Sequence, residues 1–291
     1  MQHDLRSFIL RQAGLIQLCA HTQGNASSGI ALIDGTVNVT HPALQGCQIS
    51  KVGDSRSVRA GEHATFSASI LVAGEAAQKS GRVMGICSGC TLFNYAFVTD
   101  DMLTGSLSTR EVARTLAVAV NLAVEANCQT IVFGIEIRHP ESYKWQPLRE
   151  SLLAALAAGS AVILPAGNRS GAPDATPCGW PEVLVTASRD WRGTTSLFSP
   201  LLGRTGNTIF APGENVPGAG PDSGYVVRSG TSFAAAIAAG AFGLATCLSP
   251  GRSAFDIAAD LCRPPHRILN GTTLSTNPFT CSETGGPSCT Q

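Results

Sequence analysis

Residues 230–245 read GTSFAAAIAAGAFGLA, a Gly-Thr-Ser opening followed by several helical turns of small apolar side chains. This run predicts a buried helix that begins at about Thr231. Ser232 then has two interpretations. A hydroxyl at a helix start can cap an unpaired backbone N–H group, whereas a serine beside the positive end of a helix is also a candidate nucleophile. The second interpretation requires a base, an orienting acid and an oxyanion donor elsewhere in the chain.

The composition excludes several classes of protein. The chain has 291 residues, enough for one large core or two small domains, and it is 44% hydrophobic and 14% charged. Twenty basic side chains balance twenty acidic ones, so no electrostatic feature favours nucleic acid or an anionic membrane as a partner. No apolar run reaches the roughly 20 residues that span a bilayer. We therefore expect a globular chain with neither a nucleic-acid nor a membrane partner.

The first 28 residues predict a short N-terminal helical extension. Asp4 and Arg11 interrupt its apolar run, which a secretory signal would keep continuous, so we expect a cytoplasmic chain. The apolar face of this helix would comprise Leu5, Phe8, Ile9 and Leu15 or Ile16.

Ten cysteines leave the redox compartment open. An even count is compatible with disulfides in a secreted chain and with buried thiols in a cytosolic one. Cys87-Ser88-Gly89-Cys90 has the spacing of a redox or zinc pair, but no second CxxC or HxxxH motif completes a tetrahedral site. We interpret it as a structural pair, bridged or not. No acidic cluster indicates calcium, so we predict no metal and no cofactor.

Apolar segments of strand length alternate with helical segments across residues 29–269, the predicted main domain. Strands are expected at 29–34, 90–98, 130–137, 161–168, 182–188 and 207–213. Helices are expected at 62–74, 108–127, 147–159 and from about 231. This alternation predicts a three-layer α/β fold, with a mostly parallel sheet covered by helices on both faces. Residues 270–291, rich in Gly, Pro, Ser and Thr, predict a polar C-terminal tail, poorly ordered or extended as a strap.

Four polar residues fall where a predicted strand ends or a predicted helix starts: Asp34, His63, Asn168 and Ser232. Each has an ordinary structural explanation as a turn, cap or partly buried polar residue. The alternative is catalytic. A histidine that opens a helix tends to stay neutral and can act as a general base, and an asparagine amide can donate to an oxyanion.

The chain order Asp, His, Asn, Ser and the surrounding segments resemble the subtilisin family of serine proteases. The resemblance lies in ALIDGTVNVTHPAL, EHATFSAS, ILPAGN, IFAPGENV and SGTSFAAA, between residue 29 and about residue 245. It implies a subtilisin-like fold and an endopeptidase in which Ser232 attacks the scissile carbonyl and His63 transfers its proton. It also implies that Asp34 orients His63, that Asn168 and the Ser232 N–H hold the oxyanion, and that His41 is structural.

The resemblance also assigns a substrate cleft, in which this chain departs from the family. The strand that usually carries Ser-Leu-Gly reads Gly134-Ile135-Glu136, and Glu136 either faces the substrate or points outward. Ala166, Gly167 and Arg169 would form the other wall. Arg169 falls at the first specificity pocket, so we expect that pocket to disfavour basic side chains and to accept polar or acidic ones.

A narrower resemblance concerns the substrate. Only about thirty residues precede Asp34, too few for the folding prodomain of secreted members, and the segment IDGTVNVTHPAL resembles the cyanobactin maturation proteases. This implies an intracellular enzyme that cleaves a ribosomal precursor peptide. The 29 positions from Asp34 to His63 hold no candidate for the helical insertion of macrocyclising relatives, so hydrolysis is favoured over transamidation.

Other functions remain as alternatives. The chain could be a weakly active or inactive subtilisin-like protein that binds peptides, or a peptide transamidase. An esterase or lipase would carry Gly-x-Ser-x-Gly and the order Ser, Asp, His, which differs from the order here. A nucleotide-binding domain would carry GxGxxG after the first strand or a P-loop, and the chain has neither.

Overall fold

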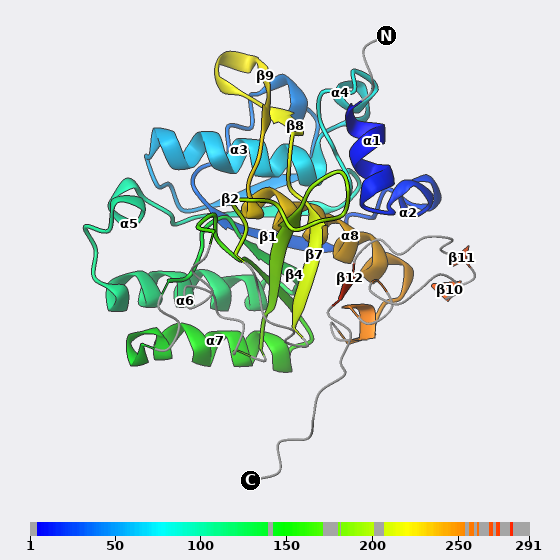
Figure 1. Ribbon diagram of the computed structural model, residues 1–291. Helices are drawn as coiled ribbons and strands as arrows, with labels where there is room; N and C mark the ends of the chain where they lie inside the picture. The colour runs from blue at the N-terminus through cyan, green and yellow to red at the C-terminus, as the bar shows by residue number, and fades with distance from the viewer. Residues whose placement is uncertain are drawn as a thin grey trace.

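A computed structural model describes residues 5–138, 142–170, 180, 182–200, 207–253, 256–258 and 261, together with the strand pairs 268–269, 272–273 and 280–281. Its centre is an eight-stranded sheet with the order β12-β7-β6-β5-β4-β1-β3-β2 (Figure 1). The strands are β1 Gly29–Asp34, β2 Ile49–Val52, β3 Thr91–Ala96, β4 Cys128–Phe133, β5 Ala161–Pro165, β6 Leu184–Arg189, β7 Thr208–Pro212 and β12 Thr280–Cys281. All neighbours pair in parallel except β12, which is antiparallel to β7.

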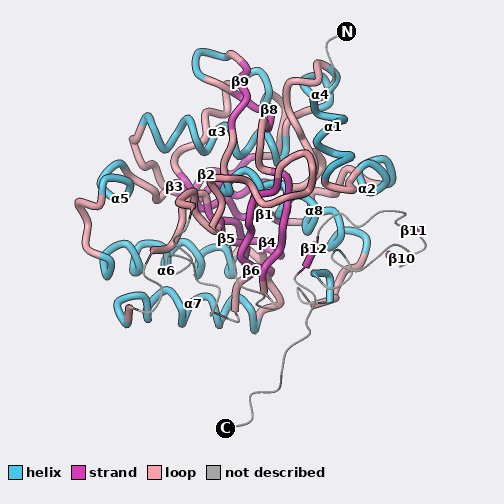
Figure 2. Tube along the Cα trace, in the orientation of Figure 1, coloured by secondary structure: helices cyan, strands magenta, loops and turns pink. Residues whose placement is uncertain are grey.

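Helices cover both faces of the sheet, as Figures 1 and 2 show. One face carries α6 (Thr109–Glu125) and α7 (Gln146–Ala157), whose apolar sides pack in one core. The other face carries α3 (Val58–Val72) and α8 (Thr231–Leu248), with α1 (Leu5–Gln12) and α2 (Ile16–His21) beside them. The predicted three-layer, mostly parallel α/β fold is therefore confirmed.

The helix α8 is the central helix of its layer. Every residue from Thr231 to Ala245 is buried, which small side chains permit because they let the helix lie close to the sheet. Its length and apolar composition alone would allow it to cross a membrane, but 83% of it is buried inside the fold. It is therefore placed as a core helix, with its first turn at the carboxyl ends of the strands.

The N-terminal segment differs from the prediction. It forms two helices, α1 and α2, because the chain turns at Gly14, whose φ of +68° is left-handed. The turn buries Leu15 completely but leaves Ile16 40% exposed, and Phe8 is 38% exposed. The expected apolar face was therefore wrong for Phe8. Ile9 and Leu15 are buried in the core that contains α8, Leu5 packs against that core, and Leu15 rather than Ile16 is the buried residue of the predicted pair.

Several short elements were not predicted. They are the outer strands β2 and β12, the helices α4 Glu75–Lys79 and α5 Asp100–Thr104, the antiparallel pairs β8 Val216–Ala219 with β9 Tyr225–Arg228 and β10 Ile268–Leu269 with β11 Thr272–Thr273, and the 3-10 helices η1 Pro42–Leu44, η2 Tyr143–Trp145 and η4 Pro221–Ser223. Within the predicted tail, β11 and β12 are described, and the other residues of 270–291 lie outside the described part. The division of the chain at residues 28 and 269 stays a prediction.

Candidate active site

Asp34 is the last residue of β1 and only 1% exposed. Its Oδ1 accepts a hydrogen bond of 2.8 Å from the backbone N–H of Gly35. Gly134, which follows β4, lies so close that a Cβ on it would overlap the Asp34 carboxylate. A Cβ on Gly35 would likewise overlap Ala60 in the first turn of α3. Because Gly134 and Gly35 have no side chains, the end of β4 can lie against this carboxylate and the first turn of α3 can lie against the residue that follows it.

His63 lies between Asp34 and Ser232. Its Nδ1–H donates to Asp34 Oδ2 over 2.7 Å, and its Nε2 faces Ser232 Oγ at 2.9 Å. The ring of Phe233 stacks on the imidazole, with centroids 5.3 Å apart and planes 27° apart. The ring is thus held on three sides.

The position of His63 in its helix differs from the prediction. Ser57 caps α3 by accepting from the N–H of Ala60, so the helix begins at Val58 and His63 lies in its second turn. The N-terminal dipole is therefore not the main influence on the imidazole. Burial acts to lower the pKa of His63, but the charge of Asp34 and its hydrogen bond outweigh burial and raise the pKa above its ordinary value.

Ser232 is the second residue of α8 and 9% exposed. Its hydroxyl donates to His63 Nε2, because the ring proton is on Nδ1, where it is hydrogen-bonded to Asp34. The backbone N–H of Ser232 is one of the amide groups at a helix start that have no carbonyl partner within the helix. The first turn of α8 thus presents both a hydroxyl and an amide donor at one point.

Asn168, in the loop after β5, is tied to the same helix. Its Oδ1 accepts from the backbone N–H of Thr231 over 2.9 Å and from the Thr231 hydroxyl over 3.2 Å. The Thr231 Oγ1 in turn accepts from the N–H of Gly167 over 3.0 Å. Because Oδ1 is occupied, the NH₂ group of Asn168 is directed away from Thr231. Sequence reasoning missed the role of Thr231, although its hydroxyl adjoins Ser232 in the chain.

A cleft of about 900 Å³ opens at these residues. Of the predicted substrate-binding residues, Gly134, Ile135, Glu136, Gly167 and Arg169 line it. Ala166 does not, because it is buried in the α6–α7 core and its N–H donates to β6. An apolar wall that the sequence did not indicate comes from α5, the segments flanking it and the first turn of α6: Val98, Met102, Leu103, Leu107 and Val112.

Charged side chains also line the cleft. Glu136 faces the cleft: one carboxylate oxygen accepts from Arg138 Nε, and the other lies where a Cβ of Gly167 would be. Arg228 pairs with Glu62 over 3.5 Å. Arg59 and Arg169 also line the cleft, and among the described residues neither has a carboxylate partner.

Other sequence candidates have structural roles. His41 is buried, its Nδ1 accepts from the N–H of Ala43, and its Nε2 donates to the carbonyl of Gly224. Cys87 and Cys90 form a disulfide. Over the described residues, no group of three or more His, Cys, Asp or Glu side chains is arranged to hold a metal ion. The described triad has the geometry for proton transfer and nucleophilic attack.

Similar structures share the arrangement of the whole domain. The prenylagaramide maturation protease PagA is 24% identical, with a TM-score of 0.72 over 91% of this chain and 95% of that chain. The PatG macrocyclase in complex with peptide is 21% identical, with a TM-score of 0.72 over 94% of each chain. The nisin leader peptidase NisP from Lactococcus lactis is 16% identical, with a TM-score of 0.71 over 94% of this chain and 92% of that chain. At these identities the likeness shows the fold.

Sequence comparison identifies the family. A thermophilic serine proteinase of Bacillus sp. (strain AK1) is 25% identical over 247 residues, which are 81% of this chain and 56% of that protein. The chain therefore spans about half the length of this curated relative. The model of the subtilase family, peptidase S8, matches residues 26–261. This match covers most of the chain and confirms the expected resemblance: the chain belongs to the subtilase family of serine peptidases.

Proposed function

We propose that this chain is a serine endopeptidase with Ser232 as its nucleophile. The proposal rests on the continuous hydrogen-bonded line from Asp34 through His63 to Ser232, with steps of 2.7 and 2.9 Å. Because Asp34 accepts a hydrogen bond from Nδ1–H and so keeps the ring proton on Nδ1, Nε2 is free to take the hydroxyl proton as Ser232 Oγ attacks the scissile carbonyl. The buried carboxylate then stabilises the imidazolium, which later protonates the leaving amine.

The negative charge that develops on the carbonyl oxygen needs donors. The Ser232 N–H and the NH₂ group of Asn168 are the two we propose, because both lie at the first turn of α8 and the helix dipole favours an anion there. Thr231 is a positioning residue in this scheme, since it holds the Asn168 amide by its oxygen and leaves the NH₂ group for the substrate.

Covalent labelling with a fluorophosphonate, followed by peptide mapping, tests this proposal. We expect the wild type to be labelled at Ser232, Ser232→Ala to stay unlabelled, and His63→Ala to be labelled far more slowly. Ser27→Ala is a matched control, because Ser27 is exposed and outside the cleft. A folded wild type that stays unlabelled, or a label at another residue, would overturn the proposal and favour an inactive peptide-binding protein.

The substrate we propose is a ribosomal precursor peptide. Support comes from the similar folds named as the maturation protease PagA and the leader peptidase NisP, and from a cleft with one apolar wall and one charged wall. An intracellular location, expected from the sequence, stays a prediction.

The first specificity pocket should select against basic side chains. Arg138 compensates the charge of Glu136, whereas Arg169 has no carboxylate partner among the described residues. The positive charge left in the pocket should therefore repel Arg and Lys and accept polar or acidic groups. Kinetics on peptides that vary only at the residue before the cut would show this preference as a difference in kcat/KM between basic side chains and polar or acidic ones. Arg169→Gln should reduce this difference, whereas Arg192→Gln, at an exposed residue outside the cleft, should leave it unchanged. A preference for Arg or Lys in the wild type would refute it.

Hydrolysis is the proposed outcome, and transamidation is the alternative that the likeness to the PatG macrocyclase raises. Between Asp34 and His63 the structure has only η1, β2 and the start of α3, with no additional α-helix. Mass spectrometry of the products separates the two reactions, because a macrocycle lacks the water molecule that a linear product has gained. A cyclic product from a peptide with a free amino terminus would favour the alternative.

A further inference from the structure

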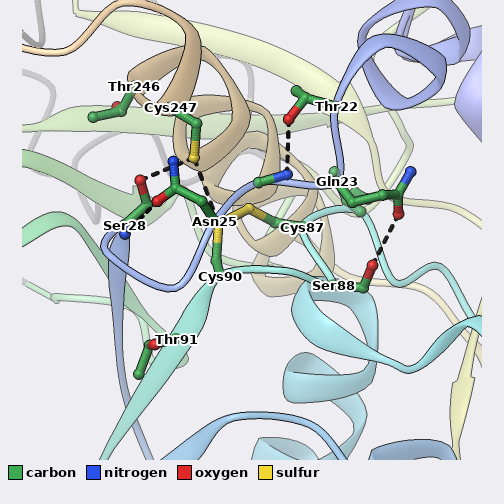
Figure 3. The surroundings of a disulfide bond; sticks show 12 residues. Thr22, Gln23, Asn25, Ser28, Cys87, Ser88, Cys90, Thr91, Thr246 and Cys247 are labelled. Carbon is green, nitrogen blue, oxygen red and sulfur yellow. Dashed lines mark hydrogen bonds between the residues drawn. A yellow bond between two sulfur atoms is a disulfide. The ribbon is translucent and has the colours of Figure 1, made fainter.

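The Cys87–Cys90 disulfide is enclosed by backbone and by α8 (Figure 3). A Cβ on Gly24 would overlap Cys90 Sγ and approach Cys87 Sγ to 2.8 Å, so the segment around Gly24 lies directly on the bond. On the other side, a Cβ on Gly243 of α8 would lie 3.1 Å from Cys87 Sγ. Both cysteines are 0% exposed. The disulfide is thus held in a closed site that excludes solvent reagents.

A third sulfur belongs to this site. Cys247 lies one helical turn after Gly243 on α8, on the same side of the helix. Its Sγ is 3.9 Å from Cys90 Sγ and 2.9 Å from the hydroxyl oxygen of Ser28 (Figure 3). Cys247 is half-buried, so it is the member of the group that solvent reaches.

We propose that these three residues form an internal thiol–disulfide exchange site, in which the disulfide moves between Cys87–Cys90 and Cys90–Cys247. The Cys247 thiolate attacks Cys90 Sγ, the Cys90–Cys247 bond forms, and the Cys87–Cys90 bond breaks. The electron pair of the broken bond goes to Cys87 Sγ, which takes up the proton that Cys247 released. Two electrons and one proton move within the group, so the exchange needs no external oxidant or reductant.

The direction of attack follows from the contacts. Cys247 touches Cys90, whereas Cys87 Sγ packs on Gly243, so Cys90 is the sulfur that accepts the new bond. The hydroxyl of Ser28 accepts a hydrogen bond from the Cys247 thiol and keeps this side chain beside Cys90. Gln23 holds the segment between the two bridged cysteines in place. The Gly89 N–H donates to the backbone carbonyl of Gln23, and the Ser88 hydroxyl donates to the side-chain oxygen of Gln23.

Two of the other described thiols, Cys19 and Cys128, are buried, unlike the half-buried Cys247. Burial raises the pKa of Cys19 to about 11 and that of Cys128 to about 12, so both remain protonated near neutral pH. Neither is disulfide-bonded. They are therefore internal standards for unreactive thiols in the same chain.

Disulfide mapping of the wild type is the first test. The full chain is held without reductant at about pH 8.5, near the ordinary pKa of a thiol, and is then denatured together with N-ethylmaleimide. We expect a peptide linked through Cys90 and Cys247, together with a maleimide label on Cys87. Cys247→Ala should abolish both signals, while Cys128→Ser should leave them unchanged. A wild type in which Cys247 is fully labelled and Cys87 is unlabelled would overturn the proposal.

Two single variants test which sulfur is attacked. Under oxidation with glutathione disulfide, Cys87→Ser should form the Cys90–Cys247 bond at least about tenfold faster than Cys90→Ser forms Cys87–Cys247. Equal rates would contradict the contact between Cys247 and Cys90. Near-ultraviolet circular dichroism shows whether each variant is folded. If neither variant folds, the wild-type map and Cys247→Ala, which keeps the disulfide, still decide the question. Fluorophosphonate labelling of Ser232 is read separately, so failure here is distinct from failure of the proposed peptidase activity.

Discussion

Replacing Asp34 by Asn tests the electrostatic centre of the site with almost no change in shape. The Gly35 N–H donates to Oδ1 of residue 34, so in Asp34→Asn this position keeps the amide oxygen, and the NH₂ group takes the place of Oδ2. His63 Nδ1 then faces a donor and must become the acceptor. The ring proton moves to Nε2, which can no longer accept the proton of Ser232.

The magnitude of this change can be worked from the contact distance. The Nδ1 and Oδ2 atoms are 2.7 Å apart, and two unit charges centred about 4 Å apart interact by about 4 kcal/mol at an effective dielectric constant of about 20. The imidazole is 26% exposed, which screens part of the interaction. We therefore expect Asp34→Asn to lower the pKa of His63, with this interaction energy as the upper bound of the effect.

The assay is the pH profile of kcat/KM on a peptide that the wild type cleaves. Activity requires neutral His63, and Asp34 raises its pKa, so wild-type activity should fall on acidification with a midpoint above 6.5. In Asp34→Asn this midpoint should move to lower pH, and the plateau should fall by about 10⁴, the loss known for the equivalent change in another serine protease.

A matched control is Asp222→Asn, an exposed residue in the turn between β8 and β9 whose left-handed backbone Asn tolerates. This variant should retain the wild-type profile. The reasoning is refuted if Asp34→Asn keeps more than about a tenth of the activity, or if its acid limb stays where the wild type has it.

Three further changes have defined outcomes. Asn168→Ala should lower kcat by about 10²–10³ with little change in KM, measured by steady-state kinetics, and an unchanged kcat would remove Asn168 from the oxyanion site. Thr231→Val should lower kcat by about tenfold or more, because it deletes the hydroxyl that bonds Asn168 and Gly167. Thr231→Ser keeps a hydroxyl and should keep kcat near that of the wild type. If the two variants lose kcat equally, Thr231 has a packing role only. Ser108→Ala breaks the capping box of α6 and should lower the free energy of unfolding by about 0.5–2 kcal/mol in urea titrations. Fluorophosphonate labelling of the folded protein should be unchanged, because Ser108 bonds Glu111 and none of the three triad residues; a loss of labelling would show that this cap also positions the catalytic residues.

The strand β1 and the helix α8, which carry Asp34 and Ser232, were predictable because nearly all of their residues are buried and therefore form continuous apolar runs. The prediction of 29–34 as a strand matches β1, in which every residue is buried, and α8 begins at Thr231 as expected. Asp34 and Ser232 are therefore placed by apolar runs that are visible in the sequence. His63 was placed less well, because the start of α3 depends on the cap formed by Ser57, which is followed by Arg59, Gly61 and Glu62 rather than by an apolar run.

The walls of the cleft were harder to predict. The helix α5, Asp100–Thr104, has only five residues, too few for a repeating helical pattern of apolar positions to be visible in the sequence. Met102 of this helix nevertheless lines the cleft. The direction of Glu136 depends on its ion pair with Arg138, two residues further along the chain, and on its tertiary contact with Gly167, which the sequence pattern does not reveal. The turn at Gly14 likewise separates two helices that a single apolar pattern would join.

Both ends of the central sheet bear on how the folded chain behaves at high concentration. At one end, β12 pairs through Thr280 and Cys281 with Ile209 and Phe210, so the last long parallel strand does not offer its full row of backbone donors and acceptors to other molecules. At the other end, β2 has four residues and exposes the charged side chain of Lys51. Short outer strands and an exposed lysine oppose strand addition from a second chain. The sheet that supports the catalytic loops is therefore also built to resist aggregation through its edges.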